Sequence, residues 1–315
     1  MIEIQHLTKR YGNKLAVNDA SFTIREGEIL GFLGRNGAGK TTTMNIITGY
    51  ISASSGSVRL DGYDILDNPR EVKRRIGYLP EQPPLYMDMT VNEYLRFACA
   101  IKDVKRSMVS SHLRDITDLV GLGEVRGRLI RNLSKGYRQR VGMAQALVGN
   151  PEVVILDEPT VGLDPKQITE VRRLIRQLGK DHTIVLSSHI LPEVADVCDR
   201  LVIIHQGRIV AEDTLEHLIR SDADSRRMRL RIEGPEKEIA DALSGIEGVR
   251  RVDRLGSREA DTFDFLLHAE EDRDVRRSVF GKMAELGFPI LIQRPMDLEL
   301  EDVFLQLTGD SGEEA

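Results

Sequence analysis

The amino-acid sequence predicts two domains: an α/β domain with a mainly parallel sheet, followed by a smaller α+β domain. Three observations support this division. Short apolar runs alternate with helical patterns over the first two thirds of the chain. A polar link at residues 221–227, "SDADSRR", then precedes a different order of elements. The length of 315 residues also suits a core of roughly 200 residues plus a smaller domain.

Four apolar runs in the first domain, which we place at residues 1–222, read as strands. Gly, Pro or polar residues bound each run, and helical patterns separate them, which is typical of parallel strands joined by helices. The runs are "EILGFLG" (28–34), "VVILDE" (153–158), "HTIVLSSH" (182–189) and "LVIIHQG" (201–207).

A helical insert is predicted within this domain, at about residues 85–145. The stretch "MTVNEYLRFACAIK" has a helical pattern, and Thr90 and Glu93 have the spacing of a capping box. A second helix begins within "NLSKGYRQRVG" (132–142) and can run as far as Pro151. It opens on Ser and Gly, and a helix N-terminus with unpaired N–H groups favours an anion.

The second domain, predicted at residues 226–308, reads as βαββαβ, which is typical of a ferredoxin-like split fold. A last helix, "LELEDVFLQLTG", closes it, and residues 309–315 form a tail. Residues 226–315 carry 14 basic and 21 acidic side chains, a net of −7, which argues against RNA binding. The six elements are "MRLRI", "EKEIADALSGI", "VRRVDRL", "TFDFLLHA", "DRDVRRSVFGKMAEL" and "PILIQ".

Composition limits the classes of function. A formal net charge of −6 makes a nucleic-acid partner unexpected, because phosphate backbones attract basic proteins. Cys99 and Cys198 both fall in stretches that read as helix, and two cysteines give no disulfide framework, which favours a reducing compartment. The first residues are charged, unlike a secretory signal, and the apolar runs are too short to cross a bilayer. A membrane role therefore needs a partner that spans the membrane.

The strongest motif is the phosphate loop "GRNGAGKT" at residues 34–41, between an apolar strand and a helix. Gly34, Gly39, Lys40 and Thr41 occupy the positions that this motif requires. Glycines let successive N–H groups face the phosphates, the lysine reaches the β and γ phosphates, and the threonine hydroxyl binds Mg²⁺. The alternative is an ordinary Gly-rich turn, which the flanking strand and helix disfavour.

A pair of acids, Asp157 and Glu158, ends the strand "VVILDE". Carboxyl ends of parallel strands lie beside such a loop, so Asp157 can hold the Mg²⁺ shell and Glu158 can orient or deprotonate a water. Acids at strand ends are usually just solvated. Together with the phosphate loop, however, the pair indicates a nucleotide hydrolase.

The motifs resemble those of an ABC transporter ATPase subunit, over roughly residues 1–220. The phosphate loop, "LPEQ", "LSKGYRQR", "VVILDEP", "VGLDP" and "LSSH" follow in that family's order and approximate spacing. The resemblance implies a P-loop NTPase fold, ATP and Mg²⁺ as ligands, and ATP hydrolysis. The variant signature, the "LEDVFLQLTG" ending and the small second domain are most similar to the ABC-2 export class, and within it to gliding-motility-associated ATPase subunits.

The resemblance also implies residue roles. Tyr11 would stack on adenine, Gln82 would sense Mg²⁺ and the attacking water, and His189 would contact the γ-phosphate. Asp164 would cross to a partner subunit. Each also has an ordinary alternative: a surface tyrosine, a loop glutamine, a histidine before a helix, and an aspartate in a turn. Implied catalytic residues are Glu158, His189 and Gln82; implied metal-binding residues are Thr41, Gln82 and Asp157; implied ATP-binding residues are Tyr11, Gly34, Asn36, Gly37, Ala38, Gly39, Lys40, Thr41, Thr42, Ser134, Gly136 and Asp164.

In this family two ATPase domains pair head to tail, and the signature helix of one covers the ATP of the other. Ser134 and Gly136 would therefore bind the γ-phosphate held by a second copy. Relative to the usual LSGGQ, Lys135 replaces a Gly and Tyr137 replaces the Gln, which leaves the strength of dimer closure open. Lys135 either adds charge near the phosphate or is simply solvated.

The resemblance implies the energy-coupling subunit of an exporter, held on the cytoplasmic face of the cell membrane by a multispanning permease. The main alternative is a soluble ABC ATPase that acts on nucleic acid or ribosomes. A long coiled coil between the phosphate loop and the signature, or two ATPase domains in one chain, would favour this alternative. This chain instead has about ninety ordinary residues between the two motifs, and it has one phosphate loop. An importer subunit is a third reading. Dimer support, regulation and plain stabilisation all remain open for the second domain.

Overall fold

The computed structural model describes residues 1–315 except 216, 219–226, 258, 260, 271–272 and 297–315. The chain forms two compact units, Met1–Leu215 and Glu216–Ala315, and each is described by itself. The domain boundary predicted at residue 222, the last helix and the tail all lie outside the described residues.

The first unit contains a six-stranded sheet in the order β10-β9-β3-β8-β7-β6. The neighbours β9-β3, β3-β8, β8-β7 and β7-β6 are parallel, as expected from the sequence, whereas β10 runs antiparallel to β9. Every residue of β3, β7 and β8 is buried, which explains their continuous apolar runs. The strands are β3 Ile29–Leu33, β6 Ile76–Leu79, β7 Val153–Asp157, β8 Thr183–Ser188, β9 Arg200–His205 and β10 Arg208–Asp213.

A second sheet in this unit is antiparallel, in the order β2-β1-β4-β5, and was not predicted from the sequence. Its strands mix buried and exposed positions and carry charged residues, so they contain no long apolar run. The strands are β1 Ile2–Tyr11, β2 Lys14–Ile24, β4 Ser55–Leu60 and β5 Tyr63–Asp64.

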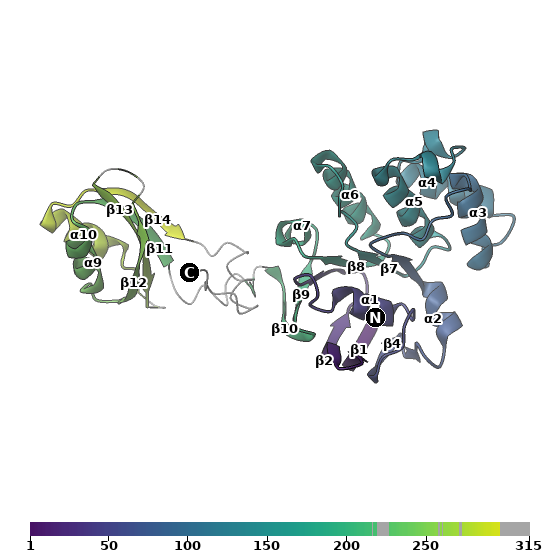
Figure 1. Ribbon diagram of the computed structural model, residues 1–315, viewed down its shortest axis with the longest axis horizontal. Coiled ribbons are helices and arrows are strands. Elements are labelled where there is room, and N and C mark those ends of the chain that lie inside the picture. Colours follow the sequence, from purple (N-terminus) through teal and green to yellow (C-terminus); the bar gives the residue numbers. More distant parts are fainter. Residues whose placement is uncertain (216, 219–226, 258, 260, 271–272, 297–315) are drawn as a thin grey trace. The chain divides into compact units, whose positions relative to one another are not determined.

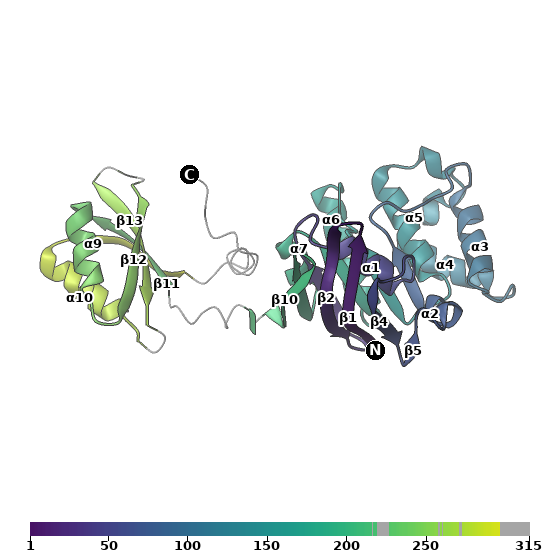
Figure 2. The ribbon, with the colours of Figure 1, turned by 60° about the horizontal axis from the view of Figure 1, so that its bottom comes forward.

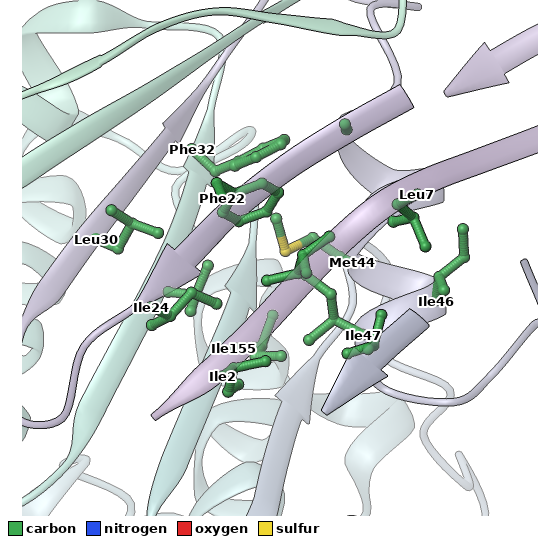
Figure 3. Close-up of a cluster of buried hydrophobic side chains, with 14 of the residues drawn as sticks. Ile2, Leu7, Phe22, Ile24, Leu30, Phe32, Met44, Ile46, Ile47 and Ile155 are labelled. Carbon is green, nitrogen blue, oxygen red and sulfur yellow. The ribbon is translucent and has the colours of Figure 1, made fainter. Parts of the chain in front are cut away.

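Helix α1, Lys40–Ile47, lies between the two sheets (Figure 1). Its Met44, Ile46 and Ile47 pack in one buried cluster with Ile2 and Phe22 of the antiparallel sheet, and this cluster continues into the six-stranded sheet (Figure 3). Burial of this much apolar surface on both sides holds the helix, and therefore the loop that precedes it, in one position.

The predicted helical insert consists of three helices and two short 3₁₀ turns. The capping box at Thr90 and Glu93 is confirmed: the threonine hydroxyl accepts from Glu93 N–H, and the Glu93 carboxylate accepts from Thr90 N–H. The second predicted helix ends at Leu147, earlier than Pro151. The elements are α3 Val91–Ile101, α4 Val109–Leu119, η1 Gly123–Val125, η2 Ile130–Asn132 and α5 Lys135–Leu147.

Helices α6, Pro165–Leu178, and α7, Leu191–Ala195, lie on the opposite side of the six-stranded sheet from α1 (Figure 1). The prediction of a helix at Cys198 was wrong, because α7 ends three residues earlier and the chain turns into β9 there. Helix α2 covers Pro69–Arg75. Within the described part of the chain, no helix is long and apolar enough to span a membrane.

The second unit has the predicted element order, β11-α9-β12-β13-α10-β14. Its antiparallel sheet has the order β12-β13-β11-β14, and α9 and α10 cover one face of it (Figure 2). Buried residues of both helices and of β11 and β13 form a separate core. The elements are β11 Arg227–Glu233, α9 Glu236–Ser244, β12 Val249–Gly256, β13 Thr262–Ala269, α10 Arg276–Leu286 and β14 Ile290–Met296.

Candidate functional site

The loop before α1 wraps too tightly for side chains at Gly34 and Gly39. A Cβ on Gly34 would lie 2.5 Å from the carbonyl oxygen of Ile204, and one on Gly39 would lie 2.5 Å from that of Ala16. Gly39 is also the N-cap of α1, with a φ of 113° that side chains rarely adopt. The loop therefore presents backbone N–H groups at a helix N-terminus, which is where proteins bind phosphate.

Lys40, the first residue of α1, is only 5% exposed, and its ammonium lies inside the site. The Nζ atom donates to the carbonyl oxygen of Gly34 at 2.7 Å and lies 3.2 Å from Oε1 of Glu158. A buried ammonium needs such partners, because an isolated charge away from water is costly. A longer hydrogen bond, of 3.4 Å, runs from Nζ to the carbonyl oxygen of Arg35. These three oxygen atoms take the places around the ammonium that phosphate oxygens would otherwise occupy.

Asp157 ends β7 and is fully buried beside the phosphate loop. Its Oδ1 atom accepts a hydrogen bond from the Ser187 hydroxyl, and the nearby Thr41 hydroxyl favours the charged form, whereas Oδ2 has no hydrogen-bond partner among the described residues. Burial raises the pKa of Asp157 above its usual value, and the two hydroxyls only partly offset this. An unpartnered carboxylate oxygen next to a threonine hydroxyl is a suitable pair of ligands for a hard divalent cation.

Glu158 follows the strand with a φ of 49°, in the left-handed region. Its N–H donates to the carbonyl oxygen of Ser187, and its carboxylate oxygen Oε2 lies 2.9 Å from Nδ1 of His189. The turn thus directs the carboxylate back toward the phosphate loop, between Lys40 and His189. A carboxylate held in this way can accept a proton from water.

Lys40, Glu158 and His189 border one pocket of about 610 Å³, whereas Gly34 and Asp157 are not among its lining residues. Tyr11, which is 50% exposed, also lines this pocket, and its contact with adenine stays a prediction. Sequence reasoning assigned no role to Lys14, Ala16, Glu81 and Val161. Glu81 and Val161 belong to the quoted motifs "LPEQ" and "VGLDP", whereas Lys14 and Ala16 had no signal. The lining residues are Tyr11, Lys14, Ala16, Asn36, Gly37, Gly39, Lys40, Thr41, Thr42, Glu81, Glu158, Val161 and His189.

The signature residues lie elsewhere in the unit. Ser134 is the exposed N-cap of α5, and its hydroxyl accepts from Tyr137 N–H at a long 3.4 Å. Gly136 borders a second pocket of about 560 Å³, together with Asp164 and Gln167. A Cβ on Gly136 would lie 2.8 Å from the Gln167 side chain, so this glycine permits close contact between α5 and α6.

Three further predicted residues have these positions. Asp164 is the N-cap of α6, where Oδ1 accepts from Gln167 N–H at 2.9 Å. Gln82 is exposed next to Glu81, which does line the first pocket. Lys135 is exposed, and its ammonium lies against Gly162 of the "VGLDP" segment.

Comparisons with known proteins agree with this geometry. The family model described as "ABC transporter" matches residues 17–161. The bacitracin transport ATP-binding protein of Bacillus licheniformis is 40% identical over 98% of this chain and 97% of its own length. The linearmycin resistance ATP-binding protein of Bacillus subtilis is 30% identical over 98% of both chains.

Solved structures show the same fold for the first two thirds of the chain. The ATP-binding subunit of an ABC transporter has a TM-score of 0.66 at 31% identity, over 71% of this chain and 93% of its own. A dimeric bacterial ABC transporter cassette has a TM-score of 0.63 at 26% identity, over 68% of this chain and 99% of its own. A dimeric cassette in a post-hydrolysis state with ADP and Pi has a TM-score of 0.63 at 25% identity, over 68% of this chain and 99% of its own. The chain therefore belongs to the ABC transporter family, as an ATP-binding subunit that hydrolyses ATP.

Proposed function

We propose that this chain is the energy-coupling subunit of an ABC-2 type exporter and that two copies bind head to tail around two ATP molecules. One observation carries the proposal. The pocket at the phosphate loop is lined by Lys40, Thr41 and Glu158, whereas the exposed Ser134 and the buried Gly136 at the start of α5 lie outside that pocket. Relatives named for bacitracin transport and linearmycin resistance support an export role. Similarity to gliding-motility-associated subunits remains a prediction.

ATP binding uses groups that the chain already holds in place. The loop N–H groups and Lys40 bind the β and γ phosphates, and Tyr11 contacts the adenine. Phosphate oxygens replace the carbonyl of Gly34 and the carboxylate of Glu158 as partners of the Lys40 ammonium. This exchange frees the Glu158 carboxylate from its ion pair.

Thr41 and Asp157, with Gln82, are the proposed Mg²⁺ ligands. The unpartnered Oδ2 of Asp157 fits this assignment, because a cation there offsets the cost of burying a charged carboxylate. When bound, Mg²⁺ neutralises charge on the β and γ phosphates.

Hydrolysis then depends on Glu158 and His189. Glu158, once released from Lys40, orients the attacking water and accepts its proton, and His189 contacts the γ-phosphate. Their 2.9 Å contact holds the carboxylate and the imidazole in one orientation. The partner copy completes the site with the Ser134 hydroxyl and the N–H of Gly136.

An aromatic cluster at the start of the helical insert is the proposed contact with the permease. Tyr86 and Met87 are 51% and 41% exposed, and the Tyr86 ring packs against Tyr94 and Phe97. Exposed apolar side chains that gather in this way usually receive a partner. A multispanning permease bound there would hold the subunit on the cytoplasmic face of the cell membrane.

Met87→Glu tests this surface in the assembled transporter. We expect loss of transport with ATP affinity retained, whereas the partly buried Leu85 also contributes to folding, so Leu85→Glu should in addition lower the melting temperature. Transport by Met87→Glu at the wild-type rate would exclude the contact.

ATP-dependent dimer formation tests the proposal as a whole. Glu158→Gln binds ATP but should hydrolyse it poorly, so its mass in solution should double with ATP and Mg²⁺ and not with ADP. A chain that stays monomeric, alone and with its permease, would refute the head-to-tail assembly. The alternative, a soluble ABC ATPase acting on nucleic acid or ribosomes, instead predicts ATPase stimulation by RNA or ribosomes and no binding to a permease.

A further inference from the structure

A buried carboxylate on α7, Glu193, lies behind the catalytic pair. The residue is only 6% exposed. Its oxygen Oε2 accepts a hydrogen bond from the hydroxyl of Thr160 at 2.5 Å and a longer one from the hydroxyl of Ser188 at 3.4 Å. Thr160 and Ser188 are buried as well. A carboxylate removed from water is costly unless its partners are well placed, so this arrangement requires an explanation.

The two hydroxyl donors flank the two residues proposed for hydrolysis. Thr160 follows Glu158 by two positions, after β7, and Ser188 directly precedes His189, at the end of β8. The Ser188 hydroxyl also accepts from Ile190 N–H at 3.0 Å, which fixes the backbone on the other side of His189. One carboxylate therefore connects the chain segments that hold the base and the histidine.

The far end of α7 is attached to a different element. The Arg172 guanidinium on α6 donates to the Asp196 carboxylate at 2.9 Å, and Arg176 Nε donates to the Asp196 carbonyl oxygen at 3.2 Å. Helix α7 is thus held at one end by α6 and at the other by the hydroxyls beside the catalytic pair. Glu158 itself has a backbone conformation that non-glycine residues adopt at a cost, so it depends on surrounding contacts to keep it.

We infer that Glu193 is a positioning residue for ATP hydrolysis: through Thr160 and Ser188 it holds the Glu158 carboxylate and the His189 ring in register. The inference rests on the roles proposed above for Glu158 and His189. Glu193 does not line the nucleotide pocket, so its removal should lower turnover and leave nucleotide binding in place.

The test compares kcat and KM for ATP in full-length variants. A displacement of about 1 Å in a reacting group can lower the rate about 100-fold, so Glu193→Ala should lose about that factor in kcat, with KM changed less than about threefold. Thr160→Val, which removes only the donor, should lose a similar factor, and Thr160→Ser, which keeps the hydroxyl, should recover most of it. The kcat of the double variant Glu193→Ala/Thr160→Val should be no lower than that of the less active single variant, because both substitutions remove the same contact.

Asp196→Asn is the matched control, since it weakens the α6 end of α7 and keeps the carbonyl acceptor of Arg176; its kcat should stay within about twofold. If Glu193→Ala does not fold, the Thr160→Val and Thr160→Ser pair decides the question. Wild-type kcat in Thr160→Val, or additive losses in the double variant, would overturn the inference. With Glu158→Gln inactive in the same assay, that result leaves the proposed function intact. An active Glu158→Gln would instead remove Glu158 from the role of base, on which this inference rests.

Discussion

Two helices in the first unit begin with residues suited to an anion, and their surroundings differ. Helix α1 starts at a glycine cap whose loop lines the pocket with Glu158 and His189, and its first residue, Lys40, is almost wholly buried. Helix α5 starts at the exposed Ser134, whose cap hydrogen bond is long. The pocket encloses the start of α1, whereas under the proposed head-to-tail pairing the start of α5 depends on another copy to bring the phosphate.

The difference also has an energetic side. At α1 the chain buries an ammonium and two carboxylates that become useful when ATP binds, and their partners in the free protein offset the cost only in part. At the start of α5 no charged side chain is buried: Ser134 and Lys135 are exposed, and Gly136 is buried against Gln167. Variants at the two helix starts should therefore separate nucleotide binding from site completion.

Lys40→Ala should have the largest effect. Removing an ammonium that binds two phosphates costs about 2–3 kcal/mol, so ATP affinity should fall about 100-fold and turnover should fall with it. Calorimetric titration of ATP measures the affinity. The control is Lys135→Ala, at the start of α5. As a monomer, this variant should bind ATP with the affinity of the wild type. Equal affinity in the two variants would mean that α1 and α5 do not differ in the way described.

Glu158→Gln should lower kcat by about 10²–10⁴-fold with ATP affinity nearly unchanged, because the amide keeps the shape and removes the base. Steady-state turnover and ATP titration measure the two quantities. Turnover close to wild type would remove Glu158 from the role of base.

Ser134→Arg should abolish most activity of the homodimer, because the larger side chain blocks phosphate contact at α5. A mixture of the Ser134→Arg protein and the Lys40→Ala protein should regain activity. In a mixed dimer both substitutions lie in the same composite site, so the other site is native. Random pairing makes about half of the dimers mixed, so about a quarter of wild-type activity should return if the sites act independently. Subunit exchange is verified by differently tagged copies. Proven mixed dimers no more active than either parent would mean that α5 acts within its own chain.

Ser134→Ala should have the smallest effect on folding. A cap hydrogen bond of 3.4 Å is weak, so its loss should cost about 0.5 kcal/mol of stability, whereas Thr90→Ala, which destroys a complete capping box, should cost about 1 kcal/mol. Urea unfolding with helical circular dichroism measures both. A loss at Ser134 larger than at Thr90 would indicate that the hydroxyl serves its own helix rather than a phosphate.

Local rules explain what could be predicted. The phosphate loop depends on glycines at fixed positions between a strand and a helix, and the capping box depends on residues three apart, so neither needs knowledge of the rest of the chain. Continuous apolar runs identified the buried parallel strands for the same reason. The helix predicted at Cys198 failed because the chain leaves α7 and enters β9 within a few residues, and helix ends are poorly marked in sequence.

The sequence by itself determined the phosphate loop, the acids Asp157 and Glu158 at the end of β7, the signature at Ser134 and the order of elements in the second unit. Only the tertiary structure decided which of these groups meet. It brings Lys14 and Ala16 of the antiparallel sheet to the pocket, pairs Lys40 with Glu158, and connects Thr160 to Glu193 across 33 residues. Such contacts join residues far apart in the chain, and their distances depend on how the sheets and helices pack rather than on any local preference.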